Sequence, residues 1–76
     1  MIVKETVYEH KGLPLSIRVE DRKIPETRET VYVSEYRIRD RGTLRIGYSR
    51  GWYGLANDAH SAAIRAARDC AELIAP

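Results

Sequence analysis

The feature that most restricts the fold is a strict alternation of apolar and polar side chains in residues 13–20, LPLSIRVE. The apolar members fall on one side of an extended chain: Leu13, Leu15, Ile17 and Val19. A period of two residues is typical of a half-buried strand. The segment therefore predicts a sheet with one covered face and one face toward solvent.

Three further segments have the composition of strands. Residues 2–9, 30–39 and 43–49 are rich in β-branched and aromatic side chains, which favour strands. The charged segment 21–29 contains Pro25 and is expected to form an exposed loop or crossover. The sequence DRG at 40–42 fits a three-residue hairpin turn with a bulge.

That turn fixes an expected register for the hairpin. Arg37 is predicted to lie opposite Arg45, and Arg39 opposite Thr43. The aromatic and aliphatic side chains are then expected on the face that packs against a helix: Tyr32, Tyr36, Ile38, Leu44, Ile46 and Tyr48. Arg37, Arg39 and Arg45 are expected on the other, open face.

The helix that covers the sheet is predicted at residues 58–74, with Asn57 as the N-cap. Small and apolar side chains line one side of it: Ala59, Ala63, Ala66, Ala67, Cys70, Leu73 and Ile74. We therefore expect an α+β fold with the order ββββα. It is a four-stranded antiparallel sheet with one C-terminal alanine-rich helix packed on one face, and residues 1–76 form a single small domain.

The chain is short for a stable core. Its 76 residues include no phenylalanine and one cysteine, Cys70, so no disulfide can form within it. A chain of this size buries only about 60% of its unfolded surface. Either the core is unusually well packed or a second copy completes it, so a homodimer is possible.

The positive charge is concentrated in one segment. The net charge is +2, but residues 36–56 alone carry a net of +4. The basic residues there are all arginine: Arg37, Arg39, Arg41, Arg45 and Arg50. Asp40 is the one acid among them. On the helix, Arg65–Asp69 and Arg68–Glu72 have the i,i+4 spacing of ion pairs, so that side is expected to be solvated.

The segment GYSRGWYGLAND, residues 47–58, contains the single tryptophan between two glycines. Two interpretations remain open for Trp52. It can pack over the end of a thin core, which we favour because the chain has few large apolar residues. It can instead be an exposed anchor beside Arg50 and Tyr53, since Trp, Tyr and Arg dominate interface hot spots.

The sequence gives little support for a catalytic, metal-binding or nucleotide-binding site. Asp58, His60 and Ser61 lie too close together on one helix to assemble a triad, and no metal-ligand spacing or phosphate-binding loop is present. Cys70 is expected to be buried and inert, and His10 and His60 to lie on the surface. We expect a protein that is not an enzyme and has no cofactor and no metal.

The location of the chain is expected to be cytoplasmic. The first residues lack the pattern of a signal peptide, and no stretch is long and apolar enough to cross a bilayer. One free cysteine fits a reducing compartment.

Two functions remain in view. The first is a small protein-interaction module of adaptor or inhibitor type that docks on an acidic partner. Compact inhibitors encoded by phages or mobile elements have this size. The second is a nucleic-acid-binding module whose arginines contact phosphates; the layout of strands followed by a supporting helix resembles sheet-first DNA-binding domains such as integrase arm-type domains. Both use the same residues: Arg37, Arg39, Arg45, Arg50, Trp52 and Tyr53. We rank the protein-interaction module first, because the total charge is near neutral and the flanks are acidic.

Overall fold

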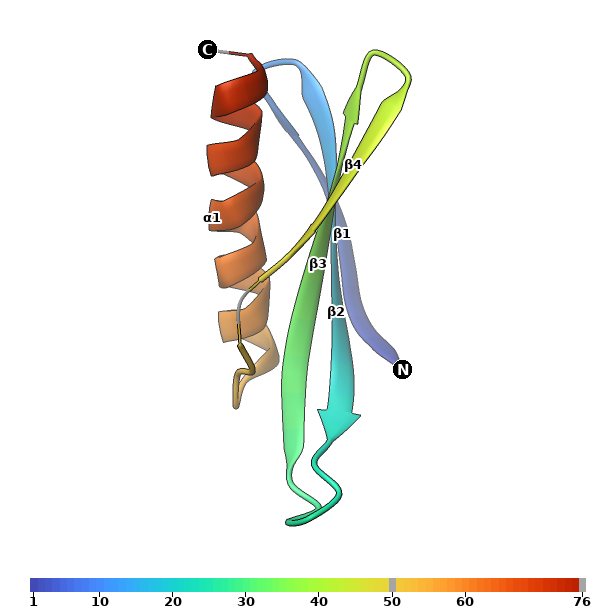
Figure 1. Cartoon of the computed structure of the whole chain (residues 1–76), viewed down its shortest axis with the longest axis vertical. Helices are drawn as coiled ribbons and strands as arrows, with labels where there is room; N and C mark the ends of the chain where they lie inside the picture. Colours follow the sequence, from blue (N-terminus) through green and yellow to red (C-terminus); the bar gives the residue numbers. More distant parts are fainter. Residues whose placement is uncertain (50, 76) are drawn as a thin grey trace.

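The computed structural model describes residues 1–49 and 51–75 and consists of four strands followed by one helix (Figure 1). The elements are β1 (Ile2–His10), β2 (Leu13–Lys23), β3 (Thr30–Asp40), β4 (Thr43–Tyr48) and α1 (Ala56–Ile74). Each strand pairs antiparallel with the next, in the order β1-β2-β3-β4. The predicted α+β fold with its C-terminal helix is confirmed.

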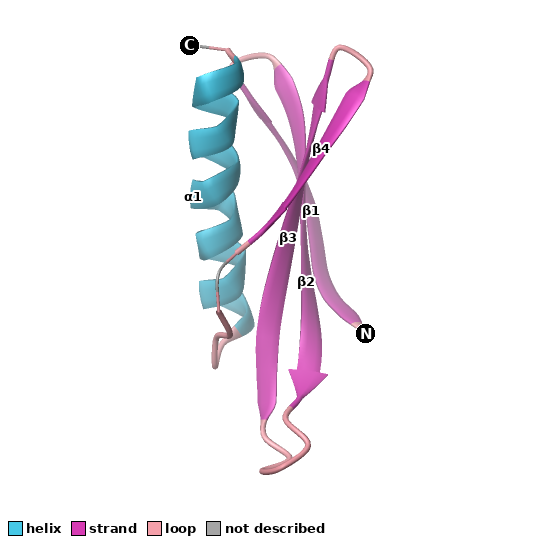
Figure 2. Cartoon of the chain, in the orientation of Figure 1, coloured by secondary structure: helices cyan, strands magenta, loops and turns pink. Residues whose placement is uncertain are grey.

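The core lies between α1 and one face of the sheet (Figure 2). It is built from alternate strand residues and from alanines of the helix: Leu15, Ile17, Val19, Ile38, Ala59, Ala63, Ala67 and Ala71. Each large aliphatic side chain buried here stabilises the fold by about 1.5–3 kcal/mol. The alanines contribute less area, but they allow the helix to lie close to the sheet. The result is a thin core, as the alternation and the alanine spacing predict.

The orientation of α1 differs in part from the prediction. Ala59, Ala63 and Ala67 face the sheet as expected, but Leu73 is 85% exposed and Ala71 takes the buried position. The helix also begins two residues earlier than predicted, so Leu55 is its N-cap, without a side-chain hydrogen bond. The prediction of Asn57 as the cap is wrong, because Asn57 already lies within the first turn.

Two hairpins have two-residue turns with positive φ at both central residues. The angles are 52° and 78° at Lys11 and Gly12, and 51° and 86° at Arg41 and Gly42. This is the type I′ turn, whose twist matches that of the flanking strands. The predicted three-residue turn is wrong, because Asp40 pairs with Thr43 and belongs to the strand. A register shift of one residue turns every side chain of β4 to the other face.

The ribbon formed by β2 and β3 is longer than predicted and extends beyond the other strands (Figure 1). β2 continues to Lys23, so residues 21–23 belong to a strand and only 24–29 form the loop. That loop is closed by backbone hydrogen bonds between Ile24 and both Arg28 and Glu29, of 2.7 and 2.9 Å. The molecule is elongated as a consequence, with extents of 43 × 18 × 17 Å.

Candidate binding surface

The face of the sheet opposite α1, called here the open face, is the candidate functional surface. Its residues follow from the register, because directly paired residues of antiparallel strands point to the same side. Ser16 and Arg37 are paired, and they alternate along β2 and β3 with the buried Ile17 and Ile38. Other members of the open face are Glu5, Val7, Glu9, Arg18, Glu20, Arg22, Val31, Val33, Glu35, Arg39, Leu44, Ile46 and Tyr48.

The observed register corrects the predicted distribution of hairpin side chains. Arg37 pairs with Ile46 rather than with Arg45. Leu44, Ile46 and Tyr48 were expected against the helix, but they lie on the open face, and Tyr48 is 70% exposed. The open face therefore has an apolar stripe along β4 that the sequence did not reveal.

Arg45 lies on the helix side of the sheet and not on the open face, where it was predicted. It pairs with Ile38, whose side chain is buried beneath the helix, so Arg45 also lies on the helix side of the sheet. Its Nε is 3.7 Å from Oδ2 of Asp40. The predicted placement of Arg45 beside Arg37 and Arg39 on the open face is therefore wrong, because the turn is one residue shorter than expected.

Most arginines of the open face have an acidic partner. Arg37 Nε lies 2.8 Å from Glu35 Oε1, and Arg18 Nε lies 3.6 Å from Glu5 Oε2. These pairs place opposite charges side by side, so the open face does not form the basic patch that the sequence suggested. Arg39 differs, since none of the acids in residues 1–49 and 51–75 lies within ion-pair distance of it.

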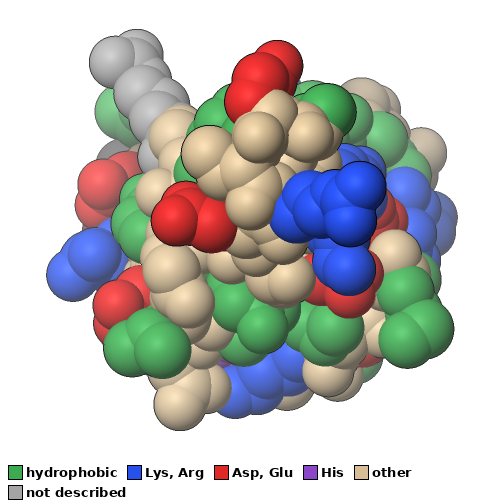
Figure 3. Space-filling view, turned by 90° about the horizontal axis from the view of Figure 1, so that it is seen from below, with side chains coloured by type: hydrophobic (Ala, Val, Ile, Leu, Met, Phe, Trp, Pro, Cys, Tyr) green, Lys and Arg blue, Asp and Glu red, His purple; other side chains and the backbone are tan. Residues whose placement is uncertain are grey.

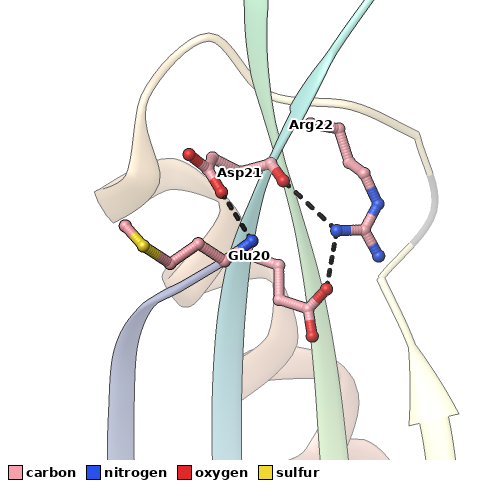
Figure 4. Close-up of polar contacts among 4 residues, drawn as sticks. Glu20, Asp21 and Arg22 are labelled. Atoms are coloured by element: carbon pink, nitrogen blue, oxygen red, sulfur yellow. Dashed lines mark hydrogen bonds and ion pairs between the residues drawn. The ribbon is translucent and has the colours of Figure 1, made fainter.

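Ion pairs between arginine and acidic side chains also occur near the C-terminal end of β2. Arg22 Nη1 lies 2.6 Å from Glu20 Oε2 and donates to the backbone oxygen of Asp21 (Figure 4). Asp21 Oδ1 accepts a hydrogen bond from the amino group of Met1, whose nitrogen lies 3.0 Å away. This hydrogen bond lowers the pKa of the Asp21 carboxyl. Seen from the β2–β3 loop, the surface mixes acidic, basic and hydrophobic side chains (Figure 3). No single sign of charge dominates that end.

Two hollows lie on the open face. One, of about 300 Å³, is lined by aliphatic and charged side chains that include Val7, Arg37, Arg39 and Leu44. The other, of about 240 Å³, is lined by residues that include Val33, Glu35 and Tyr48. Arg18 borders both hollows. The mixed linings of apolar and paired charged groups have the composition of an ordinary protein surface, which is also that of a non-obligate protein interface.

The loop that precedes α1 carries the tryptophan in an exposed position. Trp52 is 66% exposed, so the favoured interpretation that it packs over the core is wrong. The exposed-anchor alternative fits this position. Tyr53 is held against β3 by two backbone hydrogen bonds with Tyr32, of 2.8 and 3.0 Å. Arg50, the third residue predicted for this site, lies outside the described residues.

His60 is buried on the helix side, contrary to the prediction that it lies on the surface. It is 7% exposed, and its Nε2 lies 2.8 Å from Thr6 Oγ1 and 3.4 Å from the hydroxyl of Tyr8. Burial lowers the pKa of His60, and the nearby charge of Lys4 lowers it further. This imidazole connects the helix to β1, which makes its role structural.

The helix surface also pairs differently from the prediction. Glu72 lies 2.8 Å from His10 Nε2 and 2.6 Å from Lys11 Nζ, and these hydrogen bonds lower its pKa. Neither of the pairs predicted for Arg65 and Arg68 occurs among the described ion pairs. Glu72 instead fastens the last turns of α1 to the β1–β2 turn.

Cys70 is half-buried rather than fully buried and lies next to Tyr36. Burial raises the pKa of the Tyr36 hydroxyl, and the neighbouring Cys70 thiol raises it further. This arrangement places the thiol at the border of the core, on the opposite side of the sheet from the open face.

Neither a metal centre nor a membrane segment is found in the described part of the chain. Across residues 1–49 and 51–75, no three His, Cys, Asp or Glu side chains gather as a metal would require. The same residues contain no helix with both the length and the apolar character needed to cross a bilayer.

Comparison with known proteins gives no match to a family model, a curated protein or a solved structure.

Proposed function

We propose that this chain is a small, non-enzymatic protein-interaction module that docks on a partner through its open face. The proposal rests mainly on one observation: Leu44, Ile46 and Tyr48 are exposed in a row along β4, on a face that no element of the described chain covers. Aromatic and aliphatic side chains beside arginine are the residue types that anchor protein interfaces.

The charge of the open face supports a protein partner over a nucleic acid. Four arginines and four glutamates share the face, namely Arg18, Arg22, Arg37, Arg39, Glu5, Glu9, Glu20 and Glu35. The face is therefore neutral in sum, whereas affinity for nucleic acid depends on an excess of basic groups facing phosphates. Near the β3–β4 turn, Arg39 and Arg41 are exposed, so a partner with carboxylates at that end fits best.

The proposed partner is thus a protein with an apolar contact for Ile46 and Tyr48 and an acidic group for Arg39. The exposed Trp52 offers a further anchor from the loop before α1. An adaptor or an inhibitor would act in this manner, since both functions need only a surface and no chemistry. A cytoplasmic location, which the single free cysteine favours, belongs to the same proposal.

Photo-crosslinking in cells tests this proposal. A benzophenone amino acid is placed at Ile46, and in a matched control at Arg65, which is exposed on α1. We expect a discrete adduct from position 46 that protease removes and nuclease does not. A nuclease-sensitive adduct would instead support the nucleic-acid-binding module. Equal labelling from both positions, or none from position 46, would show that the open face does not bind a partner.

A further inference from the structure

β1 is an edge strand with an unpaired outer side. It lies at the end of the sheet order and pairs only with β2 within the described residues. Its outward backbone groups form a template to which another strand can hydrogen-bond. Natural edges are commonly protected by proline, by bulges or by charged side chains. β1 has no proline, and its one irregularity lies between Ile2 and Lys4.

The side chains of β1 are mixed: Lys4, Glu5 and Glu9 are charged, but four apolar side chains are exposed beside them. Val7 is 78% exposed, and Ile2, Val3 and Tyr8 are also exposed. The regular part of the strand, from Lys4 to His10, keeps its pairing with β2 without a bulge. A further strand could therefore add to this segment without distortion.

The sequence of β1 is compatible with pairing to itself. When two copies of β1 pair antiparallel around a two-fold axis, directly opposite residues point to the same face of the sheet. Their numbers therefore differ by an even number, and one central residue lies opposite itself across the axis. With the axis at Val7, Glu5 of each copy would lie opposite Glu9 of the other copy. With the axis at Glu5, that carboxylate would face itself. Like charges directly opposite each other destabilise a strand pair.

An axis at Thr6 avoids both conflicts. It also lies at the centre of β1, Ile2–His10, so the whole strand can pair, whereas an axis at Tyr8 would leave only residues 6–10 before the turn. Lys4 then lies opposite Tyr8 of the second copy, on the helix side of the sheet. Glu5 lies opposite Val7 of the second copy, on the open face. The two Val7 side chains become diagonal neighbours across the axis, within about 7–8 Å. The two Glu5 carboxylates become diagonal neighbours as well, but each already has Arg18 of its own chain as a partner, which offsets their repulsion. Lys over a tyrosine ring and valine against valine are both favourable contacts.

We infer that a second copy of this chain pairs antiparallel with β1 around Thr6, which joins two sheets into one of eight strands. The two-fold axis is perpendicular to the sheet, so both α1 helices lie on the same side. About four to six new backbone hydrogen bonds form, depending on which residues of β1 point outward. This inference does not rest on the proposed function, because it uses the outer backbone groups of β1, whereas the anchors proposed for a partner lie on β3 and β4.

The mass in solution and a pair of opposite substitutions test the inference. Sedimentation equilibrium should give twice the chain mass of 8.7 kDa for the unaltered protein at high concentration. Val7→Glu faces Glu5 of the second copy and should give the single-chain mass. Val7→Lys removes the same valine but faces that glutamate favourably, so it should remain a dimer. Ile46→Glu, at the far edge, should also remain a dimer.

Each contrary result would overturn the inference. The single-chain mass for the unaltered protein at all concentrations excludes the dimer. A dimeric Val7→Glu, or a monomeric Ile46→Glu, shows that another surface pairs. Monomers for both Val7 variants show that Glu5 is not the opposite residue. Hydrogen exchange provides a measurement without substitution: amides of residues 4–8 should exchange more slowly at high concentration, and unchanged exchange would contradict the pairing.

Discussion

The ring of Tyr36 on β3 lies directly over Gly47 on β4, in the space that a side chain at position 47 would occupy. The two residues are cross-strand partners on the helix side of the sheet. A tyrosine over a glycine fills the gap that the glycine leaves and shields its backbone. Tyr36 also packs against the core, so this contact connects the short edge strand β4 to the rest of the fold.

Gly47→Ala should therefore destabilise the protein. A Cβ at this position would overlap the ring and hydroxyl of Tyr36, which must then leave its place. We expect a loss of about 1–3 kcal/mol in the free energy of unfolding, the usual range for overpacking. Urea denaturation measures it. Gly54→Ala is the control, since a Cβ there meets no atom within 4 Å. Equal stability of both variants would show that Tyr36 moves without cost.

Ala67→Leu tests the closeness of the helix to the sheet. Ala67 is fully buried in the core cluster, so a larger side chain has to push α1 away from β2 and β3. We expect destabilisation of about 1–3 kcal/mol. Ala66→Leu should cost less, because Ala66 is only half-buried at the side of the helix. A larger effect at position 66 than at position 67 would mean that the helix is rotated so that Ala66, and not Ala67, faces the sheet.

How far the sequence predicts this protein depends on the range of the interactions involved. The alternation in residues 13–20 identifies β2 because it is a local pattern, and the alanine spacing identifies α1 for the same reason. The register of the last hairpin depends on whether Asp40 belongs to the turn or to the strand, a difference of one residue. A signal was present: both hairpins have a basic residue followed by glycine, at 11–12 and 41–42. Both use the same type of turn.

The burial of His60 and the exposure of Trp52 could not be predicted without knowledge of the tertiary structure. The burial of His60 depends on Thr6 and Tyr8, which lie 54 and 52 residues earlier and approach it only in the folded sheet. The exposure of Trp52 could not be derived from composition, because half-buried residues such as Tyr36 and Ile64 already pack against the core cluster. A small core therefore does not have to contain the largest side chain of its chain.

The exposure of Trp52 predicts its spectroscopic behaviour. With 66% of its surface accessible, the indole should emit near the wavelength of free tryptophan and be quenched readily by acrylamide. Trp52→Ala should change the free energy of unfolding by less than about 0.5 kcal/mol, as for most surface substitutions. Fluorescence and urea denaturation check both points. A blue-shifted emission together with a large loss of stability would place the indole in the core.

The buried His60 predicts a dependence of stability on pH. Because its pKa is lowered in the folded state, the unfolded chain binds the proton first as the pH falls below about 6.5. The free energy of unfolding should then decrease from about pH 6.5 down to the lowered pKa of the folded state, and change no further on account of this group. Urea denaturation at a series of pH values measures the slope.

His60→Gln serves as the comparison for this slope. Glutamine retains a hydrogen-bonding group for Thr6 but does not titrate, so the decrease just below pH 6.5 should disappear. The carboxyls of Asp21 and Glu72 have lowered pKa values, and the stability they provide is lost only at more acidic pH. A slope unchanged by His60→Gln would show that another group causes it.

Arg39 and Arg45 allow the proposed binding surface to be tested against total charge. Both are exposed arginines near the β3–β4 turn, but Arg39 lies on the open face and Arg45 on the helix side. Arg39→Glu and Arg45→Glu change the net charge equally. We expect Arg39→Glu to reduce the crosslinking yield from position 46 by about tenfold, a loss of ~1.4 kcal/mol that is typical of an interface anchor. Arg45→Glu should leave the yield unchanged. Equal losses would indicate that the partner senses overall charge rather than the open face, which would favour nucleic acid, and the salt dependence of binding would then distinguish the two.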